Sequence, residues 1–471
     1  MARRSVARAS VLAFLSMVAL GAAGCAGDRA REVASALSQT LANQRVPSSV
    51  IAALCGEKPP PTCASRTKDI WPDVRAFYSK RTGRPIWVNH EAPTRQATDA
   101  LAALARAAEH GLDPERYGAA PLGAAQTQLA DAPGPGAAAA DMARFEADVT
   151  AALIALGHDV AVGSSGAPPA GVPSGSRRTA PDIVSRLAAA IDEESLATWP
   201  DAMRPVHPEY AALQRVLAAG PQPPDRARAI ALNMERWRWL PDDLGARHIL
   251  INIPEYRMRL RENGRPVLDS RVIVGKLGDE TPVFSARMVS VIFSPYWNIP
   301  ESIAEGETVP AIVRDPAYLA KHRIEVLRRT GGDVERIDPS KVDWNNPSET
   351  AQLSLRQRPG PGNALGHVKF LLPNRYSVYL HDTPADELFA RAGRAFSHGC
   401  IRLEDPVGLA KAVLAGDPEW TDEAIRTSMH AGIERDVKLE QPIPVHIVYF
   451  TVTVDAAGGP VFLEDVYGRD R

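Results

Sequence analysis

The spacing of apolar residues changes near Ala246, and this change constrains the fold more than any other feature of the chain. Before it, four apolar residues recur at i, i+3, i+4 and i+7, which is the pattern of one helix face: Leu101, Leu104, Ala105 and Ala108. Gly111 follows them as a helix stop signal. After Ala246, apolar and polar residues alternate in short runs, as they do in strands. We therefore predict an α+β chain, in which an all-helical N-terminal part precedes a mainly β part.

The β part contains several strand-like runs and one long interruption. Asn263-Gly264 is the strongest two-residue hairpin signal in the chain. The strand-like runs are 249–253, 257–260, 272–274, 289–293, 368–372, 376–380, 445–454 and 461–466. A polar insertion at about 301–356 leans toward helix, above all at 304–321. Insertions of this kind often form a lid over a site. We expect a sandwich-like β domain that carries a helical cap.

Composition limits the classes of protein to which the chain can belong. Its 471 residues are 45% hydrophobic and 23% charged, which is typical of a folded protein with two or three domains. Lys and Arg number 54 against 56 Asp and Glu, a net charge of −2 that gives no basis for a nucleic-acid surface. Loops are expected at 132–140 and 163–175, and a break at 220–224 precedes a helix at 225–239. We place a helical domain at 47–225 and a β domain at 226–471.

The first 24 residues are typical of an export signal. Three arginines precede an apolar run at 11–20 that is too short to span a bilayer, and no other long apolar stretch follows. The run Ala22-Ala23-Gly24-Cys25 resembles a bacterial lipoprotein cleavage box, although Ala22 stands where such boxes usually have Leu. This resemblance implies lipidation of Cys25 and a tether at 25–46, with ordinary cleavage as the alternative. We expect a periplasmic or cell-envelope protein.

The cysteines can be interpreted against that oxidising compartment. Cys55 and Cys63 flank the loop Lys58-Pro59-Pro60-Pro61, and a disulfide between them would stabilise the fold by roughly 2.5 kcal/mol. Two unrelated thiols remain the alternative. Cys400 is then left without a partner, and an unpaired cysteine in such a compartment needs an explanation.

Cys400 belongs to the run Ser397-His398-Gly399-Cys400-Ile401-Arg402, just before a helix that Asp405-Pro406 begins. His381 ends a strand 19 positions earlier. A histidine can take the proton of a thiol and make it a nucleophile, and amides around Gly399 could bind an oxyanion. The residues alone leave other possibilities open: a buried structural cysteine, a zinc site formed by His381, His398 and Cys400, or a papain-like protease, whose local signatures are absent.

The motif as a whole resembles the signature of the bacterial L,D-transpeptidases, which have a YkuD-type catalytic domain. The resemblance is dense over 226–471 and diffuse over 66–218, where it is to the scaffold domain of the large subfamily. Five further runs carry it: Pro282-Val283-Phe284, Ser294-Pro295-Tyr296-Trp297-Asn298-Ile299-Pro300, Arg358-Pro359-Gly360-Pro361-Gly362-Asn363-Ala364-Leu365-Gly366, His381-Asp382-Thr383-Pro384 and Val466-Tyr467-Gly468-Arg469-Asp470.

The resemblance implies a reaction and a set of roles. Cys400 would attack the L,D bond of a peptidoglycan tetrapeptide stem, release D-alanine and pass the acyl group to the amine of a second stem. This transfer makes a 3→3 cross-link and needs no metal or cofactor. His381 would be the general base and acid, while Ser397, His398 and Gly399 would support the loop or the oxyanion. Arg402 would orient carboxylates, and Tyr379 and Trp297 would line the cleft.

Other functions remain compatible with these residues. An L,D-carboxypeptidase would use the same site with water as acceptor, and a related enzyme would join a protein lysine to the wall. A lipoprotein that binds stems without turnover is also possible, although the intact His381 and Cys400 argue against it. One departure concerns targeting, because 213–226 leaves no room for the peptidoglycan-binding module that larger members often carry.

Overall fold

The computed structural model describes residues 53–54, 56–59, 64–81, 84–89, 92–131, 139–165, 178–330 and 333–470. The predicted export signal, the tether at 25–46, the lipidation of Cys25 and the Cys55–Cys63 disulfide lie outside these residues and stay predictions. None of the described helices is both long and apolar enough to cross a bilayer.

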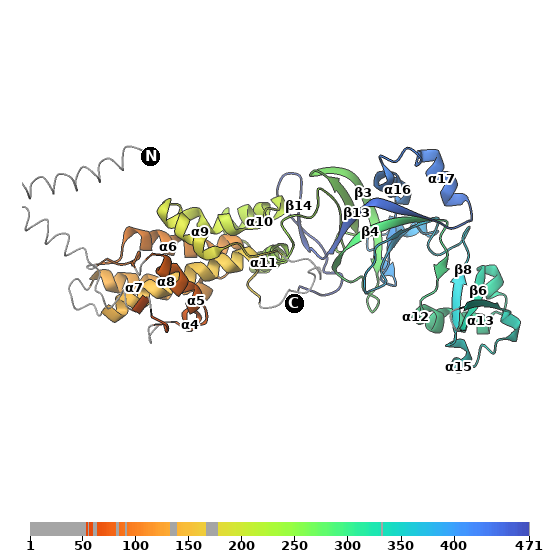
Figure 1. The fold of residues 1–471 in the computed structure, drawn as a ribbon, viewed down its shortest axis with the longest axis horizontal. Helices are drawn as coiled ribbons and strands as arrows, with labels where there is room; N and C mark the ends of the chain where they lie inside the picture. Colours follow the sequence, from red (N-terminus) through yellow and green to blue (C-terminus); the bar gives the residue numbers. More distant parts are fainter. Residues whose placement is uncertain are drawn as a thin grey trace, which may run out of the picture. The chain divides into compact units, whose positions relative to one another are not determined.

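The described chain divides into two compact units, one helical and one mainly β. The first unit contains residues up to 107, 113–157 and 182–202, and the second contains 108–112, 158–181 and 203–470. The chain is therefore α+β, as predicted, while the limits proposed for the domains stay a prediction. The helices before the β part, drawn from red to yellow-green in Figure 1, are α4 Ser65–Asp69, α5 Trp71–Lys80, α6 Arg95–Ala105, α7 Ala119–Asp131, α8 Ala139–Val162, α9 Ile183–Asp192, α10 Pro208–Ala218 and α11 Pro224–Arg238.

One buried carboxylate organises the core of the helical unit. Oε1 of Glu146, on α8, accepts hydrogen bonds from the backbone N–H of Ile86 at 2.5 Å and the hydroxyl of Tyr78 at 2.9 Å. Oε2 accepts from the N–H groups of Trp87 at 2.8 Å and Val88 at 3.0 Å. Irregular backbone in a core needs such partners, because an unpaired buried N–H is costly. Burial raises the pKa of Glu146 to about 7.

Nine of the described strands form the main sheet of the second unit, in the order β11-β3-β12-β10-β9-β4-β13-β1-β2. Their bounds are β1 Arg247–Asn252, β2 Arg257–Glu262, β3 Arg265–Gly275, β4 Phe284–Phe293, β9 Val368–Leu371, β10 Leu380–His381, β11 Ala395–Ser397, β12 Ile401–Leu403 and β13 Arg435–Val448. The short pair β14 Val452–Val454 and β15 Pro460–Phe462 lies outside this sheet.

The main sheet closes on itself, which differs from the expected sandwich of separate layers. The long strand β3 pairs with β2 through its first half and with β12 and β11 through its second half, so it links both ends of the strand order. The hairpin between β2 and β3 turns at Asn263 and Gly264, both with positive φ, as the sequence predicted. Helices α16 Pro406–Leu414 and α17 Asp422–His430 pack against the sheet in one apolar core.

The insertion between β4 and β9 is a small mixed subdomain, labelled around β6 and α13 in Figure 1. The predicted helical stretch 304–321 is confirmed as the short pieces α12 Glu301–Ile303, the π-helical turn η4 Ala304–Thr308, α13 Val309–Arg314 and α14 Tyr318–Lys321. The remainder was wrongly predicted as helical. It contains the four-stranded antiparallel sheet β5-β8-β6-β7, with the short helix α15 Pro347–Thr350. The strands are β5 Trp297–Asn298, β6 Ile324–Thr330, β7 Asp333–Ile337 and β8 Leu353–Gln357.

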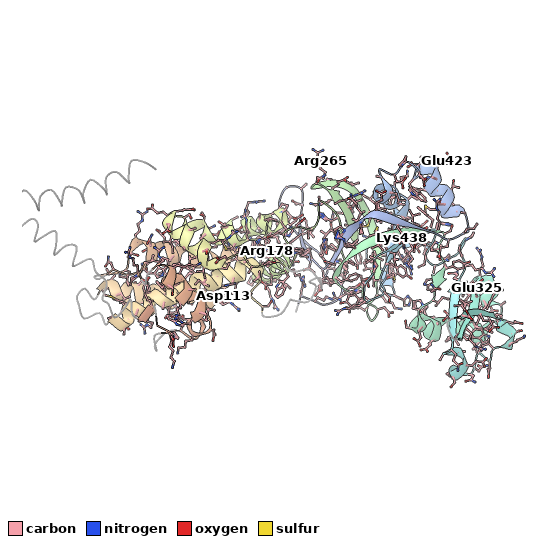
Figure 2. All side chains as sticks on the ribbon, viewed as in Figure 1. Asp113, Arg178, Arg265, Glu325, Glu423 and Lys438 are labelled. Carbon is pink, nitrogen blue, oxygen red and sulfur yellow. The ribbon has the colours of Figure 1, made fainter. Side chains whose placement is uncertain are left out.

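Cross-strand pairing explains why the insertion is not all helical. On β8, Leu355 and Gln357 are buried while Ser354 is exposed and Arg356 partly exposed, the alternation of a strand with one covered face. Glu325 on β6, labelled in Figure 2, is paired by Arg356 at 2.8 Å and Arg358 at 2.6 Å. These partners lie one strand away rather than one helical turn away. The polar composition of the insertion therefore reflects charge pairs across strands. In the sequence, such residues resemble those on the surface of a helix.

We predict that Glu146→Ala lowers the free energy of unfolding of the helical unit by about 3 kcal/mol, because it leaves buried N–H groups without an acceptor. The native pKa of Glu146 is raised to about 7, so the folded state binds the proton more tightly than the unfolded state. Its contribution is therefore complete at low pH and is lost as the pH rises through the folded-state pKa. Urea unfolding at several pH values should show both effects.

The matched control is Glu193→Ala, at an exposed glutamate that follows α9 in the same unit. It should leave both the midpoint and its pH dependence unchanged. Equal effects of the two substitutions would contradict the role given to Glu146.

Candidate active site

Three adjacent strands align the central residues of the site in a row. His381 on β10 is paired with Lys369 on β9 and with Arg402 on β12. Directly opposite residues in a sheet share a face, so these three side chains project from the same side. Their neighbours in sequence project from the other side and are fully buried in the core: Phe370, Leu380 and Ile401.

Tyr379 and Cys400 lie on the same face, two positions before His381 and Arg402. The N–H of Ile401 donates to the carbonyl of Tyr379 at 3.1 Å, which places the two segments side by side. Burial and then the Cys400 thiol raise the pKa of the Tyr379 hydroxyl, while Trp297 acts in the opposite direction. The rings of Tyr379 and His381 meet edge-on with centroids 5.7 Å apart.

The strand predicted at 376–380 is much shorter than expected, and this difference shapes the site. Only Leu380 of this run is in a strand, because the side chain of Asn374 binds the backbone of the residues just before Leu380. Its amide donates to the carbonyl of Val378 at 2.7 Å and its oxygen accepts from Tyr376 at 2.9 Å. Ser377 consequently has a φ of +56°, and its carbonyl lies 3.9 Å from the sulfur of Cys400.

His381 is only 4% exposed and is held in one tautomer. Its Nδ1 lies 2.5 Å from the carbonyl oxygen of Asp382. A carbonyl can only accept, so Nδ1 carries the hydrogen and Nε2 of the neutral ring is a proton acceptor. Burial, and then the charges of Arg402 and Lys369, lower the pKa of His381 to about 3. The ring is therefore a neutral base at physiological pH.

The carboxylate of Asp382 serves the turn instead of the imidazole ring. Its oxygens accept from the N–H groups of His367 and Thr383, each at 2.7 Å.

The loop that bears Cys400 is fixed by hydroxyl groups. Ser397 is 2% exposed, and its hydroxyl donates to the carbonyl of Cys400 at 2.5 Å while accepting from the N–H of Gly399 at 3.1 Å. The Gly399 N–H is therefore already occupied in this conformation, and its role as an oxyanion donor stays a prediction. Gly399 also provides the turn, with a φ of +102° that disfavours other residues. Its carbonyl accepts from the hydroxyl of Thr281 at 2.9 Å.

Two supporting residues, Thr281 and Tyr467, were missed by the sequence analysis. The Thr281 hydroxyl also accepts from the N–H of Gly275 at 2.8 Å. The hydroxyl of Tyr467 donates to the carbonyl of Gly275 at 2.6 Å and accepts from the N–H of Thr281 at 3.3 Å. The C-terminal segment thereby supports the loop. Thr281 stands beside the Pro282-Val283-Phe284 run and Tyr467 within the last run quoted above, which was the available signal.

The environment of Cys400 contains cations but keeps the thiol partly withdrawn from water. Cys400 is a free thiol. Burial raises its pKa, while Tyr379, Lys369 and Arg402 act in the opposite direction. The Nε of Arg402 is buried and has no hydrogen-bond partner among the described residues, and burial lowers the pKa of this guanidinium. A buried donor without a partner favours binding of a polar or anionic group.

Cys400, Tyr379, His381 and Arg402 line a cavity of about 220 Å³. The predicted active-site residues line it, except Gly399, and so do the cap residues Ile303 and Glu307. The complete lining is Trp297, Pro300, Ile303, Glu307, Ala364, Leu365, Tyr379, His381, Ser397, His398, Cys400 and Arg402. Glu307 connects the cap to the loop, since its carboxylate lies 2.8 Å from Nε2 of His398. Lys276 lies 3.2 Å from the same nitrogen. His398 therefore contacts the cap as well as supporting the loop.

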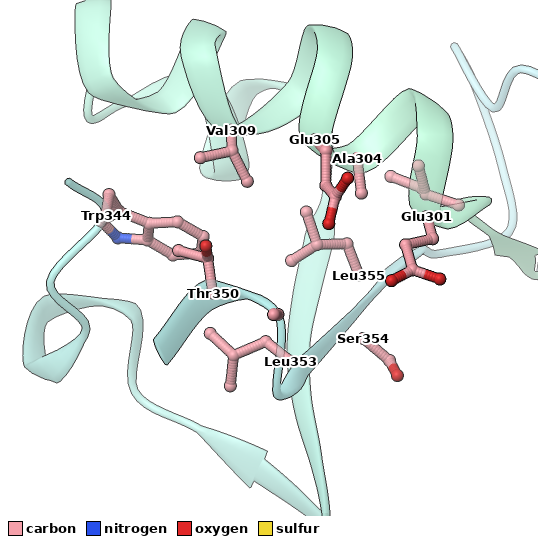
Figure 3. A pocket seen from close by; sticks show the side chains of 11 residues that line it. Glu301, Ala304, Glu305, Val309, Trp344, Thr350, Leu353, Ser354 and Leu355 are labelled. Atoms are coloured by element: carbon pink, nitrogen blue, oxygen red, sulfur yellow. The ribbon is translucent and has the colours of Figure 1, made fainter. Parts of the chain in front are cut away.

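A second cavity of about 230 Å³ lies within the cap. Figure 3 shows Glu301 and Glu305 on the helical segment above it and Trp344 at one side. The same segment presents Ile303 and Glu307 to the cavity of Cys400. One helical segment therefore forms a wall of both cavities. The second cavity contains no cysteine or histidine, so we place the chemistry at Cys400.

The geometry does not support a zinc site formed by His381, His398 and Cys400. Among the described residues, no group of three or more His, Cys, Asp or Glu side chains could hold a metal ion. His398 contacts Glu307 and Lys276, and His381 contacts the Asp382 carbonyl.

Comparison with known proteins gives one family match for each part of the chain. The family model of the L,D-transpeptidase catalytic domain, YkuD, matches residues 246–420, and that of a scaffold domain matches 72–217. A curated protein of Haemophilus influenzae named "Putative L,D-transpeptidase" is 34% identical over 242 residues, which are 51% of this chain and 48% of that protein. The chain thus spans about half the length of this curated relative.

Solved structures of similar proteins include an L,D-transpeptidase from Mycobacterium smegmatis, with 12% identity and a TM-score of 0.21 over 43% of this chain and 58% of that chain. L,D-transpeptidase 3 from Mycobacterium tuberculosis, in complex with a faropenem-derived adduct, has 13% identity and a TM-score of 0.20 over 43% and 60%. Both TM-scores are low, so the site described above rests on the geometry of this chain.

We predict that alkylation of Cys400 by iodoacetamide accelerates with pH up to and beyond about pH 9, because burial raises the pKa of the thiol. The pKa of His381 is lowered to about 3, so no imidazolium is present to stabilise a thiolate at neutral pH. Peptide-level mass spectrometry of the full chain measures the rate at Cys400. A rate that is already constant between about pH 5 and 8 would indicate a thiolate–imidazolium pair and contradict this prediction.

Proposed function

We propose that this chain, which carries an L,D-transpeptidase catalytic domain behind a scaffold domain, forms 3→3 peptidoglycan cross-links through a thioester on Cys400. One observation carries the proposal. Cys400 and a neutral His381, whose Nδ1–H is bound to the Asp382 carbonyl, open into the same cavity. This is the arrangement that a nucleophile and its general base require.

In the first half of the reaction, Nε2 of His381 takes the thiol proton as the sulfur attacks the carbonyl of the third stem residue. A carbon–sulfur bond forms, and the carbonyl oxygen becomes an oxyanion. The bond to the terminal D-alanine then breaks, and His381 returns the proton to the departing amine. The Tyr379 hydroxyl belongs to the same cavity as Cys400 and can donate to this oxyanion, whereas the Gly399 amide is already bound.

In the second half, the amine of an acceptor stem attacks the thioester and gives a proton to His381. The carbon–sulfur bond breaks, and the thiol recovers the proton. Water competes with the amine at this step, so the site must exclude it. The cap supports this requirement, because Ile303, Glu307 and Trp297 cover part of the cavity.

Arg402 and Trp297 provide the contacts for the substrate. The unpartnered Nε of Arg402 suits a carboxylate of the stem peptide, which would otherwise enter a buried site unpaired. The Trp297 indole lines the cavity together with Tyr379 and presents an apolar wall, so it excludes water from the site.

The same proposal includes export to the cell envelope and lipid anchoring through Cys25. It rests on the sequence at 1–25, because those residues lie outside the described structure. Peptidoglycan stems are found in the envelope, so the proposed substrate and compartment agree.

We predict that the full chain, incubated with disaccharide-tetrapeptide ending in D-alanine, produces a cross-linked dimer that has lost one D-alanine. Mass spectrometry of the products measures this. Cys400→Ala should give no dimer, and His381→Gln should lower the rate by about 10²- to 10⁴-fold through loss of the base. Tripeptide without dimer would show an L,D-carboxypeptidase. Unchanged substrate would count against both enzymes and favour a stem-binding protein.

We also predict that imipenem adds covalently to Cys400, since its strained carbonyl can take the place of the stem carbonyl. Intact mass of the full chain should rise by one imipenem, and Cys400→Ala should remove the adduct. The double substitution Cys55→Ser with Cys63→Ser is the matched control and should keep it. An unchanged mass of the wild-type chain, with Cys400 shown to be a free thiol, would contradict the prediction.

A further inference from the structure

Lys369 is a half-buried cation next to the site that neither the motif nor the cavity lining includes. It stands on β9 directly opposite His381, and its Nζ lies 4.0 Å from the centre of the Tyr379 ring. Within the described parts of the chain, no hydrogen bond or ion pair engages its ammonium. Burial lowers the pKa of Lys369, while the charges of Cys400 and Glu434 raise it. The ring of Tyr379 is therefore its principal direct contact.

An ammonium on the face of a phenol ring does more than pack. The ring's π electrons are drawn toward the cation, and the contact strengthens where water is excluded. Withdrawal of electron density from the ring makes the phenolic O–H a stronger hydrogen-bond donor. In this protein Tyr379 and Cys400 line the same cavity on adjacent segments, so the effect reaches the site of the reacting sulfur.

We propose that Lys369 is a positioning residue for the reaction at Cys400, which acts through Tyr379: its ammonium packs on the ring and makes the hydroxyl, in the cavity that it shares with Cys400, a stronger hydrogen-bond donor to the sulfur. The proposal rests on the proposed function, in that Cys400 is the reacting thiol. Lys369 transfers no proton, because the thiol proton goes to His381. It stabilises negative charge on the sulfur before attack and when the thioester breaks.

The position of Lys369 suits this role better than direct contact with substrate. It does not line the cavity of Cys400, whereas Arg402, on the other side of His381 in the row, does. The charged and titratable groups around Lys369 are Cys400, Glu434, His381 and Tyr379. The two cations therefore have different tasks: Arg402 faces the substrate, and Lys369 acts from behind the tyrosine.

A double-substitution cycle separates action through the ring from direct attraction to the sulfur. Lys369→Met, Lys369→Arg, Tyr379→Phe and the combination of Lys369→Met with Tyr379→Phe are compared in the full chain. The measured quantity is the rate of iodoacetamide alkylation of Cys400 from about pH 6 to 10, read by peptide mass spectrometry. Alkylation needs no stem peptide, so the outcome is independent of whether the chain cross-links stems.

We expect Lys369→Met to slow alkylation at neutral pH by about 3- to 10-fold, the range of a partly buried cation–π contact, and to shift the pH profile upward. Lys369→Arg should restore the rate to within about 2-fold, since a guanidinium also packs on a ring. In the Tyr379→Phe background, Lys369→Met should have no further effect.

An unchanged rate in Lys369→Met would overturn the proposal. An equal slowing with and without the Tyr379 hydroxyl would do so too, because the charge would then act directly on the sulfur. If Lys369→Met fails to fold, as judged by circular dichroism, Lys369→Gln takes its place in the cycle. Arg375→Met is the matched control and should change nothing, since Arg375 packs on the nearby ring of Tyr376, away from Cys400.

Discussion

The register between β9, β10 and β12 determines the arrangement of the site. It sets His381 between Lys369 and Arg402, and through the two-residue period of a strand it also sets Tyr379 beside Cys400. The alternate residues, Leu380, Ile401 and Phe370, are fully buried, so the core itself enforces this register. A slip of one position would put the base and both cations into the core and the core residues into the cavity. The chemistry is thus fixed by apolar packing on the reverse face.

Burial explains why the thiol is not permanently ionised, although the two cations act against it. A buried histidine between positive charges stays neutral, and a thiol partly removed from water stays protonated. The Asp382 carbonyl orients the imidazole without contributing a full negative charge, whereas a carboxylate there would favour the imidazolium. A resting thiol is less readily oxidised than a thiolate.

The sequence predicted the α+β class, the hairpin at Asn263-Gly264, the helix after Asp405 and the convergence of His381 and Cys400, because each depends on local pattern or on a dense motif. It failed where long-range pairing decides the outcome. In the sequence, the polar residues of β6 and β8 resemble those of a helix surface. In the structure, Glu325 pairs with Arg356 on the neighbouring strand. The sequence suggests Gly399 as an oxyanion donor, but in the structure its N–H donates to the Ser397 hydroxyl. Lys369 was unremarked because only the strand register shows that it faces His381.

The helical segment of the cap faces two ways, with Glu301 and Glu305 toward one cavity and Ile303 and Glu307 toward the other. Within it, the π-helical turn at Ala304–Thr308 departs from regular α-helical spacing. Deleting one residue there would restore that spacing and rotate every later side chain of the segment by about 100°, which would change the residues that it presents to each cavity. The shape of both cavities is therefore open to change by insertions and deletions in a single turn, while strands β9, β10 and β12 keep their sequence.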